Sequence, residues 1–314
     1  DGVGAGRSDP VVNPLARHDA LLSWFSDGAP PALPAGGQGR LVDACLGVEG
    51  RPQSATGQTA ILTGVNAPRS LGHHLLGFPN APLRRILDAH SLFAALRAAG
   101  VPAAFANPYP LAYLHAFGLP HQPHCAPEPT LPIPRRRLRT SASTCAVAAA
   151  GLPFRTFADA RRGLALPHDL TGQRARERGF DVPELSPREA AQVLLRIGEG
   201  HGFVLFEHFL LDELGHARAL DDAVEELARY DAFLRALVAG LGPEDHLLVV
   251  SDHGNVEDLS VRSHSRNPVP FLAFGPRAAA LVASVRALTD VRAAVFAACG
   301  AVDPAPPPEI VHVP

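Results

Sequence analysis

The chain has 314 residues, of which 46% are hydrophobic, so it is long and apolar enough to bury a sizeable core. Charged residues make up 19% and the formal net charge is −3, which argues against a disordered chain and against a nucleic-acid-binding protein with a basic surface. No apolar run reaches the roughly 18 residues that a membrane-spanning helix needs. We therefore expect a globular protein with neither a nucleic-acid nor a membrane partner.

The first half of the chain holds two predicted helices separated by less regular segments. Residues 29–39 are rich in Pro and Gly and are expected to form a loop. Residues 54–64 begin with small residues and continue as an apolar run, which is typical of a helix. Residues 91–99 predict a second helix, which Gly100 follows as a C-cap.

The middle of the chain, residues 68–140, is expected to form a small cap or insert. Its part at 107–134 is rich in Pro and His, and a cluster of arginines follows: Arg135, Arg136, Arg137 and Arg139. These arginines either clamp a substrate phosphate or carboxylate, or form a solvated surface run. We interpret the remaining residues, 1–67 and 141–314, as the core of the protein.

Short apolar runs alternate with helical patterns in the second half of the chain. We expect strands at 203–206, 247–250 and 269–274, and helices at 187–197, 217–241 and 289–299. The runs are apolar throughout, which suits strands that are buried on both faces. Their alternation with helices predicts an α/β fold with a doubly wound, mostly parallel sheet and helices on both faces.

The four cysteines are widely spaced and form no CxxC pair: Cys45, Cys125, Cys145 and Cys299. This pattern is typical of free thiols in a reducing compartment, so we predict a cytoplasmic protein. No signal peptide is visible, but the chain has no Met and begins directly on a motif. We therefore expect further residues upstream of Asp1.

Two segments near the N-terminus carry possible catalytic groups. Asp1 precedes Gly2, which puts a carboxylate at a sharp turn, although Asp-Gly turns are common. Ser54 stands at the start of the helix expected at 54–64, where serine is a frequent helix cap. The helix dipole and the free N–H groups there also suit a nucleophile and an incoming phosphate. Thr56 is the rival nucleophile.

Three later segments carry possible metal ligands. Asp212 and His216 are four residues apart, so they share one helix face and can bind one ion, unless Asp212 only caps the helix. Asp252 and His253 directly follow the strand at 247–250, at the end where α/β sheets bind ligands. His264 lies just before the strand at 269–274, a position that an ordinary surface or core histidine also takes.

Two other histidine groups are interpreted as ordinary residues rather than as a further metal site. They are His73-His74 and His121-x-x-His124-Cys125. The second group lacks the matching distant pair of ligands that a structural metal site needs.

The order of the five segments resembles the alkaline phosphatase superfamily, most closely its cofactor-independent phosphoglycerate mutase and phosphopentomutase branch. The matching motifs are Asp1, Ser54 ten residues before Gly64, Asp212-x-x-x-His216, Asp252-His253-Gly254-Asn255, and His264 shortly before Asn267-Pro268-Val269-Pro270. The resemblance is strong after Gly200 and poor between about Pro68 and Gly200.

The resemblance implies two divalent metal ions, Mn²⁺ or Zn²⁺, about 4 Å apart. It assigns one ion to Asp212, His216 and His264. It assigns the other to Asp1, Asp252 and His253 together with the oxygen of Ser54. The same family mechanism implies a small phosphorylated substrate and a phosphoserine intermediate at Ser54.

The reaction itself is left with alternatives. We predict hydrolysis of a small phosphomonoester, because the candidate cap at 68–140 is short, rich in proline and without lysine, although its arginine cluster favours a mutase. The phosphoglycerate mutases of this branch use a site lysine and a large insert, whereas this chain has no Lys and a shorter insert. A phosphomutase or a phosphodiesterase is the alternative. A non-catalytic metal-binding relative would have lost a ligand or the nucleophile, and all of these are present. The sequence does not favour a sulfatase, because no C-x-P-x-R or S-x-P-x-R motif occurs.

Overall fold

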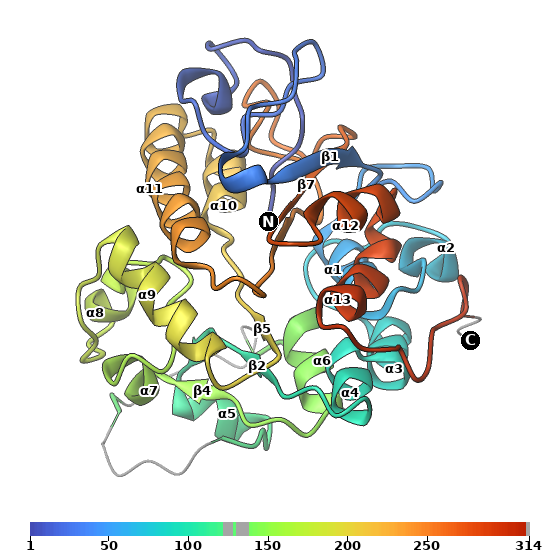
Figure 1. Cartoon of the computed structure of the whole chain (residues 1–314), viewed down its shortest axis with the longest axis vertical. Coiled ribbons are helices and arrows are strands. Elements are labelled where there is room, and N and C mark those ends of the chain that lie inside the picture. Colours follow the sequence, from blue (N-terminus) through green and yellow to red (C-terminus); the bar gives the residue numbers. More distant parts are fainter. Residues whose placement is uncertain (122–127, 130–137, 312–314) are drawn as a thin grey trace.

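The computed structural model describes residues 1–121, 128–129 and 138–311. In this part of the chain, helices surround a small number of strands (Figure 1). The predicted α/β class is therefore confirmed. No helix within the described ranges is both long and apolar enough to cross a membrane.

The largest sheet is antiparallel. It contains β1 (Gln38–Val42), β7 (Val269–Phe274) and β6 (Leu247–Val250), with β7 in the middle. Parallel strands need a crossover of a dozen or more residues, usually a helix. The segment 251–268 between β6 and β7 contains no helix, so the chain returns beside β6 in the opposite direction.

Two short sheets are parallel. β2 (Ala103–Phe105) pairs with β5 (Phe203–Leu205), and β3 (Pro108–Tyr109) pairs with β4 (Arg155–Thr156). The predicted arrangement, one doubly wound and mostly parallel sheet, is thus not confirmed among the described residues.

Strand β7 is the centre of the hydrophobic core, because alternate residues of a strand point to opposite faces. Leu272 and Phe274 belong to one buried cluster, whereas Val269, Phe271 and Ala273 belong to another. Every residue of β7 is buried. Two layers of the core therefore lie on the two sides of this strand, and three smaller buried clusters lie elsewhere in the described part of the chain.

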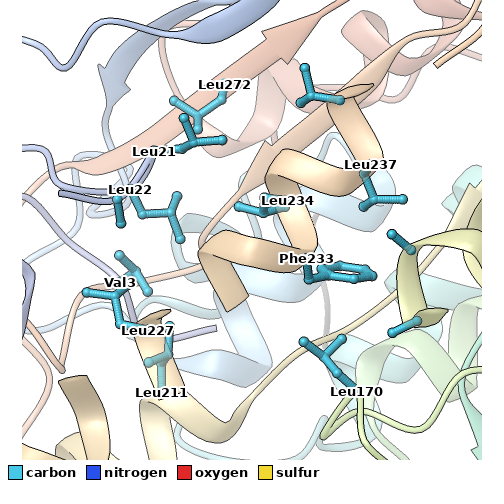
Figure 2. Packing of buried hydrophobic residues seen from close by; sticks show 14 of the residues in the cluster. Val3, Leu21, Leu22, Leu170, Leu211, Leu227, Phe233, Leu234, Leu237 and Leu272 are labelled. Atoms are coloured by element: carbon cyan, nitrogen blue, oxygen red, sulfur yellow. The ribbon is translucent and has the colours of Figure 1, made fainter. Parts of the chain in front are cut away.

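The first layer is formed largely by α9 (Pro187–Gly198), α10 (Leu210–Ala217) and α11 (Leu220–Gly240). Helix α9 starts with a capping box between Ser186 and Glu189, and Pro187 follows at the first helical position. Side chains of α10 and α11 pack against residues of the N-terminal segment and β7 (Figure 2).

The second layer contains α1 (Ser54–Thr63), α4 (Leu92–Ala98), α12 (Ala278–Ser284) and α13 (Val291–Ala298). Arg292 in α13 is fully buried, and its guanidinium donates to both carboxylate oxygens of Asp303 at 2.6 and 2.9 Å. It thereby ties the C-terminal segment to this layer.

The remaining helices complete the body of the molecule. They are α2 (Ala67–Leu71), α3 (Ala81–His90), α5 (Leu111–Ala116), α6 (Ala142–Ala149), α7 (Phe157–Arg161) and α8 (Gln173–Glu177), with short 3₁₀ turns at Pro14–Arg17, Pro34–Gly36 and Leu288–Asp290. Helix α3 packs against α1 and α6, and β2 pairs with β5. The division into a core and a cap at 68–140 stays a prediction.

Candidate functional site

The seven side chains predicted to bind metal or to act as nucleophile come from distant parts of the chain and lie together. Ser54 is the first residue of α1, and α10 carries two of the others. A pair follows directly after β6, and one more stands in the segment that leads to β7. The N-terminal ammonium of Asp1 donates to the carbonyl of His208 at 3.0 Å, just before α10.

The first group surrounds Nε2 of His253. The hydroxyl oxygen of Ser54 lies 2.9 Å from this nitrogen, Oδ1 of Asp1 lies 3.3 Å from it, and Oδ2 of Asp252 lies 3.6 Å from it. His253 is fully buried and Asp252 nearly so. The donor atoms of Asp1, Asp252 and His253 all lie within 4.8 Å of one another, close enough to share one ion.

The second group lies around Asp212. Its carboxylate is 3.4 Å from Nε2 of His216, one helical turn later, and 3.6 Å from Nε2 of His264. The rings of His264 and His253 stack with their centroids 3.7 Å apart, which joins the two groups. Donor atoms of Asp212, His253 and His264 also lie within 4.8 Å of one another, so His253 borders both groups.

The ring nitrogens of this second group fit a bound cation. Nδ1 of His264 lies 3.0 Å from the carbonyl oxygen of Pro52, and Nδ1 of His216 lies 3.2 Å from that of Arg262. Each Nδ1 that donates there leaves a lone pair on Nε2 of a neutral imidazole, and the two Nε2 atoms face each other at 3.1 Å. Two lone pairs repel at this distance, and a cation bound by both relieves the repulsion.

Unsatisfied buried atoms support the same conclusion. Oδ1 of Asp1, Oδ1 of Asp252 and Nδ1 of His253 are buried without a hydrogen-bond partner. Unpaired polar atoms in such positions are costly unless a water or an ion satisfies them. Burial lowers the pKa of His264 to about 4, with His253 acting in the same direction, so its imidazole stays in the neutral form that binds metals.

The start of α1 holds Ser54 against the first group, which surrounds Nε2 of His253. Gln53 stands at the N-cap position without a capping side-chain hydrogen bond, and the Ser54 hydroxyl contacts His253 instead of capping the helix. A Cβ on Gly57 would come within 2.6 Å of the carbonyl oxygen of Asp252, so only glycine allows the helix to approach so closely. The rival Thr56 is buried and donates to the carbonyl of Gln53 at 3.1 Å.

Two neighbouring amides contact the carboxylates: Gln58, which was not identified from the sequence, and Asn255, which belongs to a matching motif but was given no role. Nε2 of Gln58 donates to Oδ2 of Asp1 and to Oδ2 of Asp252, both at 3.1 Å. Nδ2 of Asn255 donates to Oδ1 of Asp212 at 2.7 Å. These bonds orient the three carboxylates. For Gln58, the one sequence feature that could have pointed to the site is its position one turn after the start of α1, on the helix that begins with Ser54.

A buried carboxylate lies behind the site. Glu257 accepts from the backbone N–H groups of Gly4 and Asn255 at 3.0 and 2.7 Å, and from the side chains of Ser265 and Asn267. It thereby connects the N-terminal segment to the segment before β7. No sequence pattern distinguishes Glu257 from other acidic residues.

A cavity of about 680 Å³ opens beside Ser54. Arg139 lines it, and its guanidinium carbon lies 5.8 Å from the ring centroid of Phe78. The other arginines of the predicted clamp, Arg135, Arg136 and Arg137, lie outside the described residues, as do His124 and Cys125. Neither His73 nor His74 belongs to a metal-binding group in the described part of the chain.

Comparisons with known proteins agree with this geometry. Residues 182–301 match the family model of the metalloenzyme superfamily. The chain is 39% identical over 82 residues to a phosphopentomutase of Methylobacterium nodulans, a match that covers 25% of this chain and 20% of that protein. It is 41% identical over 61 residues to a phosphopentomutase of Symbiobacterium thermophilum, covering 19% and 16%. The chain thus spans a fifth or less of the length of these two relatives.

A solved structure extends the likeness to the whole fold. The alkaline phosphatase of the Antarctic bacterium TAB5 superposes with a TM-score of 0.53, covering 95% of this chain and 96% of that one. The sequence identity is only 12%, so this likeness concerns the fold alone.

Proposed function

We propose that this alkaline phosphatase-like metalloenzyme, a relative of the phosphopentomutases, transfers phosphoryl groups through Ser54 with the help of two divalent metal ions. The observation that carries the proposal is the position of the Ser54 hydroxyl, 2.9 Å from a histidine that borders both groups of metal-binding atoms. A nucleophile next to such groups is the arrangement that two-metal phosphoryl transfer requires.

Each metal ion has a proposed set of ligands. Asp1, Asp252 and His253 hold the ion next to Ser54, and the remaining ligands, Asp212, His216 and His264, hold the other. Carboxylates and imidazoles together suit Mn²⁺ or Zn²⁺. The bound ions supply positive charge at the attacking and leaving oxygens of the displacement.

The protein supplies the positioning. The first turn of α1 has backbone N–H groups without partners inside the helix, and these bind the phosphate oxygens next to Ser54. Gln58 holds the carboxylates of Asp1 and Asp252 in place through its amide. In the reaction the Ser54 hydroxyl loses its proton to solvent and its oxygen forms a bond to phosphorus, while the P–O bond of the ester breaks and the released alkoxide takes up a proton from solvent to leave as the alcohol.

We propose that water then removes the phosphoryl group, so that the overall reaction is hydrolysis of a phosphomonoester. A mutase keeps water from its phosphoserine and holds the substrate body through charged contacts. The cavity of about 680 Å³ leaves room for water beside Ser54, which favours hydrolysis, whereas Arg139, Arg174 and Arg178 in its lining offer the charged contacts that a mutase uses. The phosphopentomutase relatives make the mutase reaction the alternative to be tested.

The test follows two products from one substrate. Metal-loaded protein is incubated with ribose 5-phosphate, and both free phosphate and ribose 1-phosphate are measured. Release of phosphate that Ser54→Ala abolishes supports hydrolysis. Formation of the isomer without phosphate release would replace hydrolysis by the mutase reaction.

We also propose a cytoplasmic location. Among the described residues, Cys45, Cys145 and Cys299 are free thiols, which is the usual state of cysteines in a reducing compartment. Labelling of these thiols in intact cells, compared with labelling after lysis, tests the proposal.

A further inference from the structure

The cavity beside Ser54 is lined by aromatic rings as well as by metal-binding residues. The rings include Phe78, Tyr113, Phe157, His168, Phe209 and Tyr230. Its volume of about 680 Å³ lies within the range of roughly 300–1,000 Å³ that is typical of cavities for drug-sized ligands. A phosphate group at Ser54 therefore leaves a large, partly apolar space for the rest of the substrate.

Two of these rings form one rigid surface. His168 and Phe209 stack with their centroids 3.9 Å apart and their planes 14° from parallel. Phe157 stacks in a similar way on the buried Phe180, at 4.1 Å and 28°. Rings held by such partners lose little conformational freedom when a ligand packs against them, so the entropy cost of binding is small. Because the rings are planar, a flat aromatic ligand makes the largest contact with them.

His168 contributes to this surface as an uncharged ring. Burial lowers its pKa to about 3, and His208, Arg174 and Arg178 act in the same direction. The imidazole is therefore neutral at physiological pH and does not attract the phosphate as a cation. It presents an aromatic ring beside Phe209.

We propose that the physiological substrate is a phosphomonoester whose alcohol carries a planar aromatic ring, as a nucleoside 5′-phosphate does, and that this ring packs on His168 and Phe209. The inference rests on the proposed function, because the phosphate must lie at Ser54 for the ring to occupy the aromatic part of the same cavity. It adds the chemical class of the substrate.

The test compares pairs of esters whose leaving oxygens are both primary alkoxides and of which only one member carries an aromatic ring. Adenosine 5′-phosphate and ribose 5-phosphate both release a primary alcohol at the same carbon, and 3-phenylpropyl and propyl phosphate form a second pair. We expect kcat/KM to be about tenfold higher for the member with the ring, the order expected for one buried stacking contact. A higher kcat/KM for the ring-bearing ester in the first pair alone would mean that the site prefers a nucleoside. A higher kcat/KM in both pairs would mean that the site accepts any planar aromatic group.

Variants locate the contact. His168→Leu and Phe209→Leu each remove one ring and retain apolar bulk, so either is expected to reduce the preference several-fold. Phe25→Leu removes a ring that is not part of the cavity lining and serves as the control. A preference that neither cavity variant alters would overturn the assignment to this pair of rings.

A binding measurement separates this inference from the proposed function. Zinc-loaded Ser54→Ala is titrated with adenosine 5′-phosphate and with ribose 5-phosphate, and the two dissociation constants are compared. If Ser54→Ala binds adenosine 5′-phosphate more tightly than ribose 5-phosphate, the inference is supported. If the unmodified protein then turns over neither ester, the proposed function is contradicted while the inference stands. Equal affinities, together with equal kcat/KM values, overturn the inference and leave the proposed function in place.

Discussion

The hydroxyl oxygen of Ser54 lies 2.9 Å from Nε2 of His253, although 199 residues separate them in the chain. The contact places the first residue of α1 beside a fully buried histidine that borders both groups of metal-binding atoms. Ser54 is therefore the hydroxyl to substitute first.

We expect Ser54→Ala to abolish turnover and to leave most of the metal affinity, since Asp1, Asp252 and His253 remain. Activity and metal content are measured on the same preparation. Thr56→Ala is the matched control, because its hydroxyl bonds to the backbone and is expected to be dispensable for chemistry. An active Ser54→Ala with an inactive Thr56→Ala would show that the nucleophile is misassigned.

We expect His264→Ala and His253→Ala to differ in metal content. His264 belongs to one group of donor atoms, so its loss weakens the binding of one ion. His253 borders both groups, so its loss weakens the binding of both ions. Metal analysis after gel filtration should find about two equivalents in the unmodified protein and fewer in His253→Ala than in His264→Ala. Equal losses in the two variants would contradict the shared position of His253.

Glu207 makes the stability of the metal-free protein depend on pH. Burial raises the pKa of its carboxyl to about 7, although the hydroxyl of Ser143 donates to it and lowers it. The protonated form is favoured in the folded state, so this contribution is fully present below the ordinary pKa near 4.5 and is lost as the pH rises through about 7.

We therefore expect the unmodified protein to lose about 2 kcal/mol of unfolding free energy relative to Glu207→Gln between pH 5 and pH 8. Urea unfolding in the presence of a chelator measures the difference. Glu49→Gln, at an exposed position, is the control and should follow the unmodified protein. Parallel pH profiles for Glu207→Gln and the unmodified protein would mean that Glu207 is ionised normally.

Arg292 is expected to be important for stability. Its buried guanidinium bonds to both oxygens of Asp303 and to the carbonyl oxygen of Thr63 at 3.3 Å. Arg292→Ala is expected to lower the free energy of unfolding by about 3 kcal/mol, because it leaves buried acceptors unpaired. The exposed Arg286→Ala should change it by less than about 0.5 kcal/mol. A similar small effect for both, measured by urea unfolding, would contradict the structural role of Arg292.

Much of the secondary structure could be predicted from the sequence. The strands at 247–250 and 269–274 coincide with β6 and β7, since both are uniformly apolar runs with clear ends. The helix expected at 217–241 instead begins at Leu220, because Arg218 has a left-handed backbone with φ of 56°. Strand direction could not be predicted, since it depends on the helix-free segment 251–268.

The site could be predicted only in part, for a physical reason. Motifs reveal side chains that stand next to each other in sequence, such as Asp252 and His253. They do not reveal groups that reach the site from elsewhere, such as Glu257, which contacts Gly4 across 253 residues. The metal assignments and the role of Ser54 stay predictions until they are tested.

Trapping of the phosphorylated intermediate shows whether Ser54 is the nucleophile. Metal-loaded protein is mixed with adenosine 5′-phosphate, quenched in acid, and examined by peptide mapping with mass spectrometry. We expect one added phosphoryl group, located on Ser54, and none when the metal is removed by a chelator. Turnover of the substrate with the phosphoryl group on another residue, or with Ser54 never labelled while Ser54→Ala remains active, would contradict this expectation.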